Sequence, residues 1–376
     1  MKHIISKTLT LLLVVALSFF VFAPPGRMGD LQYNNEDHDA SPCSAEAVSE
    51  DTKIGSRFLE LLFGKESESD NNKTVLLIPG GGIFGAKIKQ AYVSVQNPGD
   101  SHALKVGDKI LSFNGTKITC VDDVKKCTES IGSDEITLEC ERGGKHITVK
   151  LKPKEVDGEY RLGIVLKDGA AGVGTITYID PKTGEFGGLG HGICDTDAGE
   201  VIDFTSGKVT GVILNGVKKG EEGKPGELSG LLTDKVNGSL YSNTECGVFG
   251  KLNVIPSNLS ATPIEIAHRN EVHEGEATIL STVKLGPVRE FKIKIKEINK
   301  SSTGTKSFKI EVTDPALIAI TGGVVRGMSG SPIIQDGKLV GAVTHVMVAN
   351  PTEGYGIFIE NMLNASNVAR NELPAA

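Results

Sequence analysis

The chain has 376 residues, 46 of them glycine, no tryptophan and a net charge of −7. This length suits two domains with tails, and the acidic balance without a basic stripe excludes nucleic acid as the expected partner. Short runs of valine, isoleucine and threonine that end at Gly, Asn-Gly or Asp-Gly predict a mainly β protein.

Lysines at positions 2 and 7 precede an apolar run over residues 9–23. This pattern is typical of a signal peptide or a short signal anchor within residues 1–27. Because no clear A-x-A cleavage site follows, we favour a membrane anchor with the bulk of the chain exported. Residues 28–73 are rich in Asp, Glu, Ser and Asn, which predicts a flexible linker and an accessible region for self-cleavage.

A first folded domain is expected over residues 74–155. Strand-like runs alternate there with glycine turns, Asn114-Gly115 predicts a hairpin, and residues 119–130 predict a helix. The stretch LKVGDKILSFNGTKI resembles the PDZ signature. In that family a glycine-containing loop offers N–H groups to a peptide C-terminus, and the bound peptide adds a strand to the sheet. The resemblance assigns this loop to Ile83, Phe84, Gly85 and Ala86, with an intramolecular clamp as the alternative use.

The second domain is expected over residues 156–370. Short strands separated by glycine turns continue there without a second linker, which predicts a double barrel or sandwich. A loop is expected at residues 299–305, and a strand that leads into a closing helix is expected at residues 355–363.

The sequence Gly327-Met328-Ser329-Gly330-Ser331-Pro332, followed by a β-like run, resembles the nucleophile turn of trypsin-like serine proteases. Its glycines allow sharp backbone dihedrals, and the N–H groups of Gly327 and Ser329 are predicted to form an oxyanion hole. Ser331 is the rival nucleophile. A glycine-rich loop without catalytic function is the alternative interpretation of this motif.

A catalytic serine needs a base, and His191 is the best candidate because glycines surround it. His345 is the main rival, although its apolar strand favours a core or cleft-wall position. His268 and His273 lie in a charged segment and are expected to be solvated. The residues alone do not decide which aspartate completes a catalytic triad. Asp314 is one candidate, but it precedes a proline and suits a helix start equally well. The competitors are Asp195, Asp197 and Asp203.

Cysteine usage gives no metal signature. The sequence holds no C-x-x-C pair and no other ligand spacing, so neither a metal nor an organic cofactor is expected. The segment 120–140 is compatible with a disulfide in an oxidising compartment and equally with buried free thiols. The six cysteines are Cys43, Cys120, Cys127, Cys140, Cys194 and Cys246.

A wider resemblance covers roughly 300 residues. The chain resembles the stage IV sporulation protein B family, the PDZ-containing serine peptidases of endospore-forming bacteria. This resemblance implies a triad of His191, Asp314 and Ser329, although the spacing from aspartate to serine is shorter than in ordinary trypsin-like chains. The stretches that carry it are LLIPGGGIFGAKI, GVGTITYIDPKTGEFGGLGHGICD, KKGEEGKPGELSG and TGGVVRGMSGSPIIQDGKLVGAVTHVMVANPTEGYGIFIENML.

The resemblance implies a signalling endopeptidase that is exported across the forespore inner membrane into the space between two membranes. Such proteins cut themselves and then a membrane-anchored regulator, which leads to processing of a sigma-factor precursor. The PDZ domain is implied to restrain the peptidase and to bind a protein tail. The alternative hypothesis is a membrane-tethered PDZ scaffold whose β domain has no catalytic function.

Overall fold

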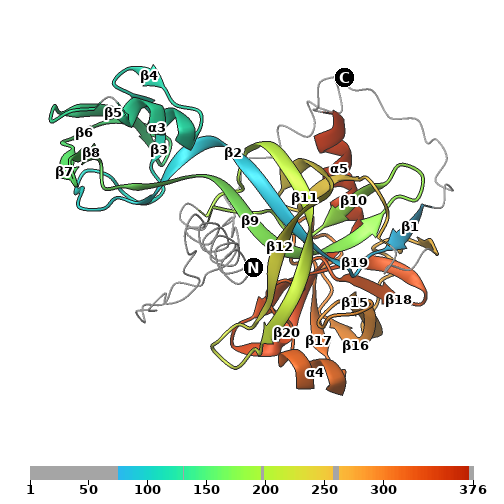
Figure 1. Ribbon diagram of the computed structural model, residues 1–376. Coiled ribbons are helices and arrows are strands. Elements are labelled where there is room, and N and C mark those ends of the chain that lie inside the picture. The colour runs from blue at the N-terminus through green and yellow to red at the C-terminus, as the bar shows by residue number, and fades with distance from the viewer. Residues whose placement is uncertain (1–74, 130, 196–198, 257–261, 372–376) are drawn as a thin grey trace, which may run out of the picture. The chain divides into compact units, whose positions relative to one another are not determined.

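The computed structural model describes residues 75–129, 131–195, 199–256 and 262–371, and most of them lie in strands (Figure 1). The membrane segment expected at residues 9–23 and the linker expected at 28–73 lie outside these residues. Among the described helices, none combines the length and the apolar character that crossing a bilayer requires.

The first barrel is a closed ring of six strands within the described chain. Its strands pair in the order β2, β9, β10, β13, β12 and β11, and β11 returns to β2. Its core contains Phe84 and Phe186, whose rings meet edge to face with centroids 5.5 Å apart. The strands are β2 (Ile83–Asn97), β9 (Val165–Ile179), β10 (Glu185–Gly188), β11 (Phe204–Lys218), β12 (Glu227–Thr244) and β13 (Gly247–Leu252).

The second barrel is also closed, and its described strands pair in the order β15, β16, β17, β20, β19 and β18. Strand β16 shows why these residues form a barrel wall, since apolar and charged side chains alternate along it. Phe291, Ile293 and Ile295 face the core and are fully buried, while the lysines between them face solvent. Helices α4 (Pro315–Thr321) and α5 (Ile359–Asn371) complete this part. The strands are β15 (Gly275–Ser281), β16 (Arg289–Lys296), β17 (Phe308–Val312), β18 (Pro332–Gln335), β19 (Lys338–Met347) and β20 (Asn350–Phe358).

A PDZ-type unit has a separate core, which runs from Val93 to Leu166. The Asn114-Gly115 turn has positive φ at both residues and joins β3 to β4, as the sequence predicts. Cysteines 120, 127 and 140 are free thiols. The elements are β3 (Lys109–Phe113), β4 (Thr116–Lys117), α3 (Val121–Thr128), β5 (Ile136–Arg142) and β6 (Lys145–Leu151), followed by the pair β7 (Lys154–Val156) and β8 (Glu159–Arg161).

The PDZ-type unit is an insertion within the first barrel. Strands β2 and β9 lie side by side, with residues 83–89 paired to 169–175 in the barrel and residues 94–97 paired to 165–167 beyond a register shift (Figure 1). The boundaries expected from sequence, 74–155 and 156–370, therefore differ from those of the structure. The apolar pattern of β2 is the same in both halves, so the sequence does not reveal where one core ends and the other begins.

The two barrels meet at a shared apolar cluster. Strand β1 (Leu76–Pro79) pairs with β9 and with β14 (Ile264–Glu265), and β14 is followed by a bridge from Ile266 to Leu339 of β19. Tyr178 and Phe249 of the first barrel pack there with Ala342 of the second. The turns that carry the predicted catalytic residues lie beside this cluster.

Candidate active site

The predicted nucleophile lies on a tight turn between Arg326 and β18. Gly327 and Gly330 both have φ of +95°, a conformation that glycine adopts without strain. A β-carbon on Gly330 would lie 2.0 Å from the carbonyl oxygen of Thr175, so a larger residue cannot occupy this position without a shift of the backbone. The turn leaves Ser329 half-buried.

Strand β9 of the first barrel anchors the nucleophile turn by donating hydrogen bonds to the carbonyl groups of the turn. The N–H of Thr175 donates to the carbonyl of Ser329 at 3.0 Å, and its hydroxyl donates to that of Gly327 at 2.8 Å. The hydroxyl of Thr177 donates to the carbonyl of Gly330 at 2.8 Å. The nucleophile turn is therefore built by both barrels.

The two N–H groups predicted for the oxyanion hole have no acceptor within the described chain. Met328, Gly330 and Ser331 each donate a backbone hydrogen bond, whereas the N–H groups of Gly327 and Ser329 donate none among the described residues. Two unused donors on either side of Met328 suit a developing oxyanion. Their catalytic role stays a prediction.

His191 follows β10 on a second tight turn that contacts the first. Leu189 and Gly190 have φ of +66° and +68°, and the N–H of Leu189 donates to the carbonyl of Thr175 at 3.2 Å. A β-carbon on Gly190 would lie 3.0 Å from the methyl carbon of Thr344. The histidine turn therefore packs against both β9 and β19.

The hydrogen bond of His191 determines its tautomer. Its Nδ1 lies 2.9 Å from the carbonyl oxygen of Gly192, and a carbonyl only accepts, so Nδ1 carries the proton. The lone pair then belongs to Nε2, which is the form that a general base for serine requires. Burial of the imidazole lowers its pKa below the usual 6.5, although the Gly192 carbonyl opposes this shift.

Strand β19 contributes His345 and Thr344 to the surroundings of the two turns. The rings of His191 and His345 have centroids 5.4 Å apart and are tilted by 45°. The neighbouring residue, Thr344, accepts a hydrogen bond from the Ser329 hydroxyl at its carbonyl oxygen, at 2.8 Å. For catalysis this hydroxyl has to turn from the Thr344 carbonyl to Nε2 of His191.

Asp314 is not joined to this site by a hydrogen bond among the described residues. Its carboxylate caps α4, accepting from the N–H groups of Ala316 at 2.8 Å and Leu317 at 3.2 Å, and also from Lys292 at 3.2 Å. Desolvation raises its pKa, but the three amide donors outweigh that effect and lower the pKa. The helix-start interpretation of Asp-Pro describes this geometry.

The other candidates occupy different surroundings. Asp195 is buried and forms an ion pair with Lys167 at 3.1 Å, Asp203 is exposed, and Asp197 lies outside the described residues. Ser331 is fully buried, and its hydroxyl donates to that of Ser281 at 3.1 Å, inside the second barrel.

The solvated histidines expected from the sequence are exposed. His268 contacts the carboxylate of Glu360 at 3.0 Å, and His273 contacts that of Asp336 at 2.8 Å. His268 belongs to a polar network on the second barrel that is described below.

The residues expected to form the PDZ carboxylate loop lie in β2 instead. Ile83, Phe84, Gly85 and Ala86 pair with residues 172–175 of β9, and the side chains of Phe84 and Ala86 are in the core of the first barrel. Gly85 and Ala86 also pair with β11. The expectation of an open peptide-binding loop is therefore wrong. The backbone of this segment is paired with neighbouring strands, and two of its side chains are buried in the barrel core.

Three groups that shape the site have no clear signal in the sequence. They are the Gly192 carbonyl, the Thr344 carbonyl and the Thr175 side chain, of which two act through the backbone that every residue has. Thr344 and His345 do interrupt an otherwise apolar buried strand, and that is the one pattern that points to them. Among the described residues, no cluster of three or more His, Cys, Asp or Glu side chains is placed to hold a metal ion.

Comparison with curated proteins finds partial relatives. A putative zinc metalloprotease of Lactococcus lactis is 39% identical over 93 residues, which is 24% of this chain and 21% of that protein. A putative zinc metalloprotease of Brucella suis is 28% identical over 124 residues, 32% of each chain. The chain thus spans about a fifth to a third of the length of these two relatives.

Solved structures that resemble the chain include a protease and a PDZ domain. The active form of Rv3671c protease from M. tuberculosis is 13% identical, with a TM-score of 0.33, and the match covers 55% of this chain and 78% of that one. A PDZ domain from Listeria monocytogenes is 22% identical, with a TM-score of 0.20, over 22% of this chain and 93% of that one.

A family model described as SpoIVB peptidase S55 matches residues 158–363, more than half of the chain. The matched residues include the histidine turn, the nucleophile turn and the whole second barrel. The chain therefore belongs to the SpoIVB peptidase S55 family.

Proposed function

We propose that this chain is a serine endopeptidase that is exported, cleaves itself, and then cleaves a membrane-associated regulator in signalling between the two compartments of a sporulating cell. The later consequence would be processing of a sigma-factor precursor. The family and the apolar run at residues 9–23 support this proposal. The site would lie in the space between the forespore and mother-cell membranes, with the chain anchored or secreted there.

The observation that carries the proposal is the packing of the histidine turn against the nucleophile turn. Thr175 holds both turns, through the carbonyls of Ser329 and Gly327 and the N–H of Leu189. His191 has its lone pair on Nε2, as a general base needs. Such an arrangement suits attack on a peptide carbonyl better than it suits a passive surface.

The chemistry follows from these groups. Ser329 Oγ attacks the scissile carbonyl while His191 Nε2 takes the hydroxyl proton, and the N–H groups of Gly327 and Ser329 hold the oxyanion. The imidazolium then returns the proton to the leaving amine, and water hydrolyses the acyl enzyme by the same route. The Gly192 carbonyl keeps the Nδ1 proton in place throughout.

The test is the mass of the purified full-length chain over time, for wild type and Ser329→Ala. We expect the wild type to shorten and the variant to stay whole, because the variant lacks the nucleophile; loss of the triad serine typically leaves only about 10³- to 10⁴-fold of residual catalysis. Processing of Ser329→Ala at the wild-type rate would exclude Ser329 as the nucleophile. The new N-terminus would report the cleavage site, which we place within residues 28–73.

The non-catalytic scaffold has one observation in its favour, because the Ser329 hydroxyl is bound by the Thr344 carbonyl. Labelling of wild type but not of Ser329→Ala by a serine-reactive fluorophosphonate would exclude it. If neither chain reacts or shortens, the scaffold is the better description.

A further inference from the structure

We propose that Arg269 and Asn361 are positioning residues of the peptidase. Their hydrogen bonds hold the backbone of the loop 299–307, whose Thr305 carbonyl accepts from Thr344, and the Thr344 carbonyl in turn accepts from the hydroxyl of Ser329. The proposal rests on Ser329 being the nucleophile, as proposed above. Arg269 and Asn361 are positioning residues because their hydrogen bonds act on the loop 299–307 and reach Ser329 only through Thr344.

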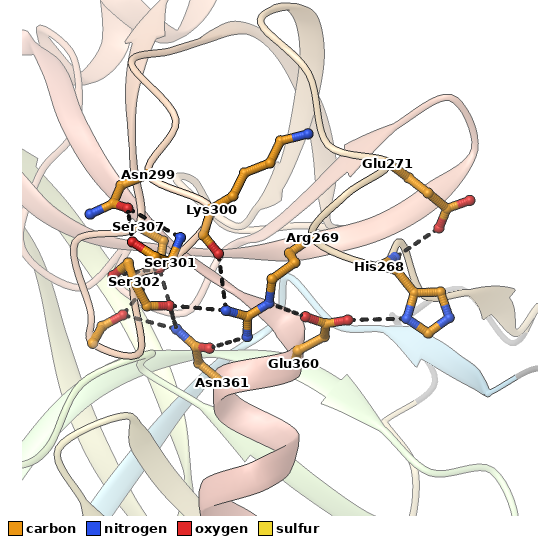
Figure 2. A network of polar contacts seen from close by, with 11 residues as sticks. His268, Arg269, Glu271, Asn299, Lys300, Ser301, Ser302, Ser307, Glu360 and Asn361 are labelled. Atoms are coloured by element: carbon orange, nitrogen blue, oxygen red, sulfur yellow. Dashed lines mark hydrogen bonds and ion pairs between the residues drawn. The ribbon is translucent and has the colours of Figure 1, made fainter. Parts of the chain in front are cut away.

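The first link is the guanidinium of Arg269, in the segment between β14 and β15 (Figure 2). Its Nε donates to Glu360 at 2.6 Å, and its Nη2 donates to the side-chain oxygen of Asn361 at 2.9 Å. Its Nη1 donates to the carbonyls of Lys300 at 3.2 Å and Ser302 at 3.4 Å. A planar fork reaches these acceptors together, whereas the ammonium of a lysine is a point charge that cannot.

The second link is Asn361, in the first turn of α5 (Figure 2). It is 5% exposed, and its amide nitrogen donates to the carbonyls of Ser302 at 3.1 Å and Gly304 at 3.2 Å and contacts the Ser307 hydroxyl at 3.3 Å. The loop 299–307 contains no helix or strand, and β17 begins only at Phe308. Side chains from two other segments therefore help to set its path.

The third link is Thr344, which is 2% exposed. Its hydroxyl lies 2.9 Å from the carbonyl of Thr305 and 3.2 Å from that of Tyr355. The pairing of β19 with β20 shifts between Val343 and His345, so Thr344 is the residue that the ladder passes over. The Thr305 carbonyl of the loop therefore holds the Thr344 side chain together with the Tyr355 carbonyl of β20, and it is the nearer of the two acceptors.

The last link is the hydrogen bond from Ser329 Oγ to the Thr344 carbonyl, at 2.8 Å. Thr344 also packs its methyl group near Gly190, beside His191. A shift of the loop moves Thr344 and, through it, the nucleophile relative to its base. Because a misplacement of about 1 Å can cost about 10²-fold in rate, this series of contacts has a catalytic consequence.

The experiment measures the rate constant for labelling of Ser329 by a biotinylated fluorophosphonate, with the purified full-length chain. We expect Arg269→Lys and Thr344→Val each to lower the rate about tenfold or more, since both break the series. Thr344→Ser keeps the hydroxyl donor and should stay within about threefold of wild type. The double variant Arg269→Lys/Thr344→Val should be labelled no more slowly than the slower single variant, because the effects of residues that act through the same contacts do not add.

The matched control is Arg289→Lys, the same substitution at an arginine that stacks on Phe291 outside this network. It should label at the wild-type rate. Circular dichroism at the assay temperature checks that each variant is folded. If Arg269→Lys does not fold, Asn361→Asp takes its place, since it keeps the acceptor for Arg269 and replaces the amide donors by an oxygen.

The outcomes separate this proposal from the proposed function. Folded Arg269→Lys and Asn361→Asp that label at the wild-type rate overturn the positioning role alone. So does a double variant whose effects multiply, because it indicates independent sites. A wild-type chain that is not labelled at Ser329 overturns the proposed function, and the positioning role with it.

Discussion

At the scale of the residue, the site depends on one imidazole whose partner is a backbone carbonyl. A triad carboxylate normally fixes the histidine tautomer and stabilises the imidazolium. Here the Gly192 carbonyl fixes the tautomer of His191, but it carries no negative charge. His191 therefore has the correct proton arrangement for a base together with a pKa that burial lowers.

This pKa gives a pH prediction for the labelling of Ser329. The neutral imidazole is the reactive form, and a lowered pKa means that it takes up a proton only below the usual 6.5. The midpoint of the rate profile should therefore lie below pH 6.5, so that more than half of the plateau rate remains at pH 6.5. Rate constants from about pH 4.5 to 8 would measure the midpoint. A midpoint at or above 6.5 would show that desolvation does not dominate the pKa of His191.

At the scale of the element, α4 accounts for the contacts of Asp314. The aspartate precedes Pro315, its side chain accepts from the first turn, and Gly322 ends the helix in a left-handed conformation. Asp314 also accepts from Lys292 and so ties the helix to the start of β16. The triad that the family resemblance implies would require the Asp314 carboxylate to contact His191. The hydrogen bonds that this carboxylate accepts all come instead from backbone amides.

Two substitutions distinguish these roles of Asp314. Asp314→Ala should lower the free energy of unfolding by about 0.5–2 kcal/mol, the usual cost of a lost N-cap. Asp314→Asn retains the cap, and we expect its labelling rate to stay within about threefold of wild type. A fall of about 10⁴-fold in a folded Asp314→Asn would show instead that the carboxylate serves His191. Denaturant unfolding gives the first quantity and fluorophosphonate labelling the second.

At the scale of the whole molecule, the PDZ-type unit interrupts the peptidase instead of preceding it. Strand β9 pairs with β2 in both cores and also carries Thr175 and Thr177, which hold the nucleophile turn. The same strand therefore links the inserted unit to the site. A deletion made at the boundaries expected from sequence, 74–155, would remove β1 and β2 and open the first barrel.

An excision that follows the structure should leave the peptidase folded. Residues 95–166 are replaced by Asn-Gly, which joins Ser94 to its partner Lys167 as a two-residue hairpin and retains the ion pair of Lys167 with Asp195. We expect this variant to unfold cooperatively and to be labelled at Ser329. The deletion of 74–155 is the matched control and should not fold. An unfolded excision variant would mean that the barrel requires the inserted unit.

The sequence was sufficient where the signal is local. The glycines around Ser329 and His191, the alternation in β16, and the Asn114-Gly115 hairpin each depend on neighbours along the chain, and the structure has the expected turns and strands at these places. The strand that leads into a closing helix is also confirmed, with β20 ending at Phe358 and α5 beginning at Ile359.

By itself, the sequence determined that the chain is β-rich and that a PDZ-type segment is present, and it predicted the glycine-framed Ser329 and His191 as the reacting pair. Only the tertiary structure decided that this segment is an insertion, that Asp314 caps a helix, and that the Gly192 and Thr344 carbonyls contact the reacting side chains. The reason is physical: Thr175 and Gly327 are 152 residues apart, and their hydrogen bond exists only once both barrels have closed.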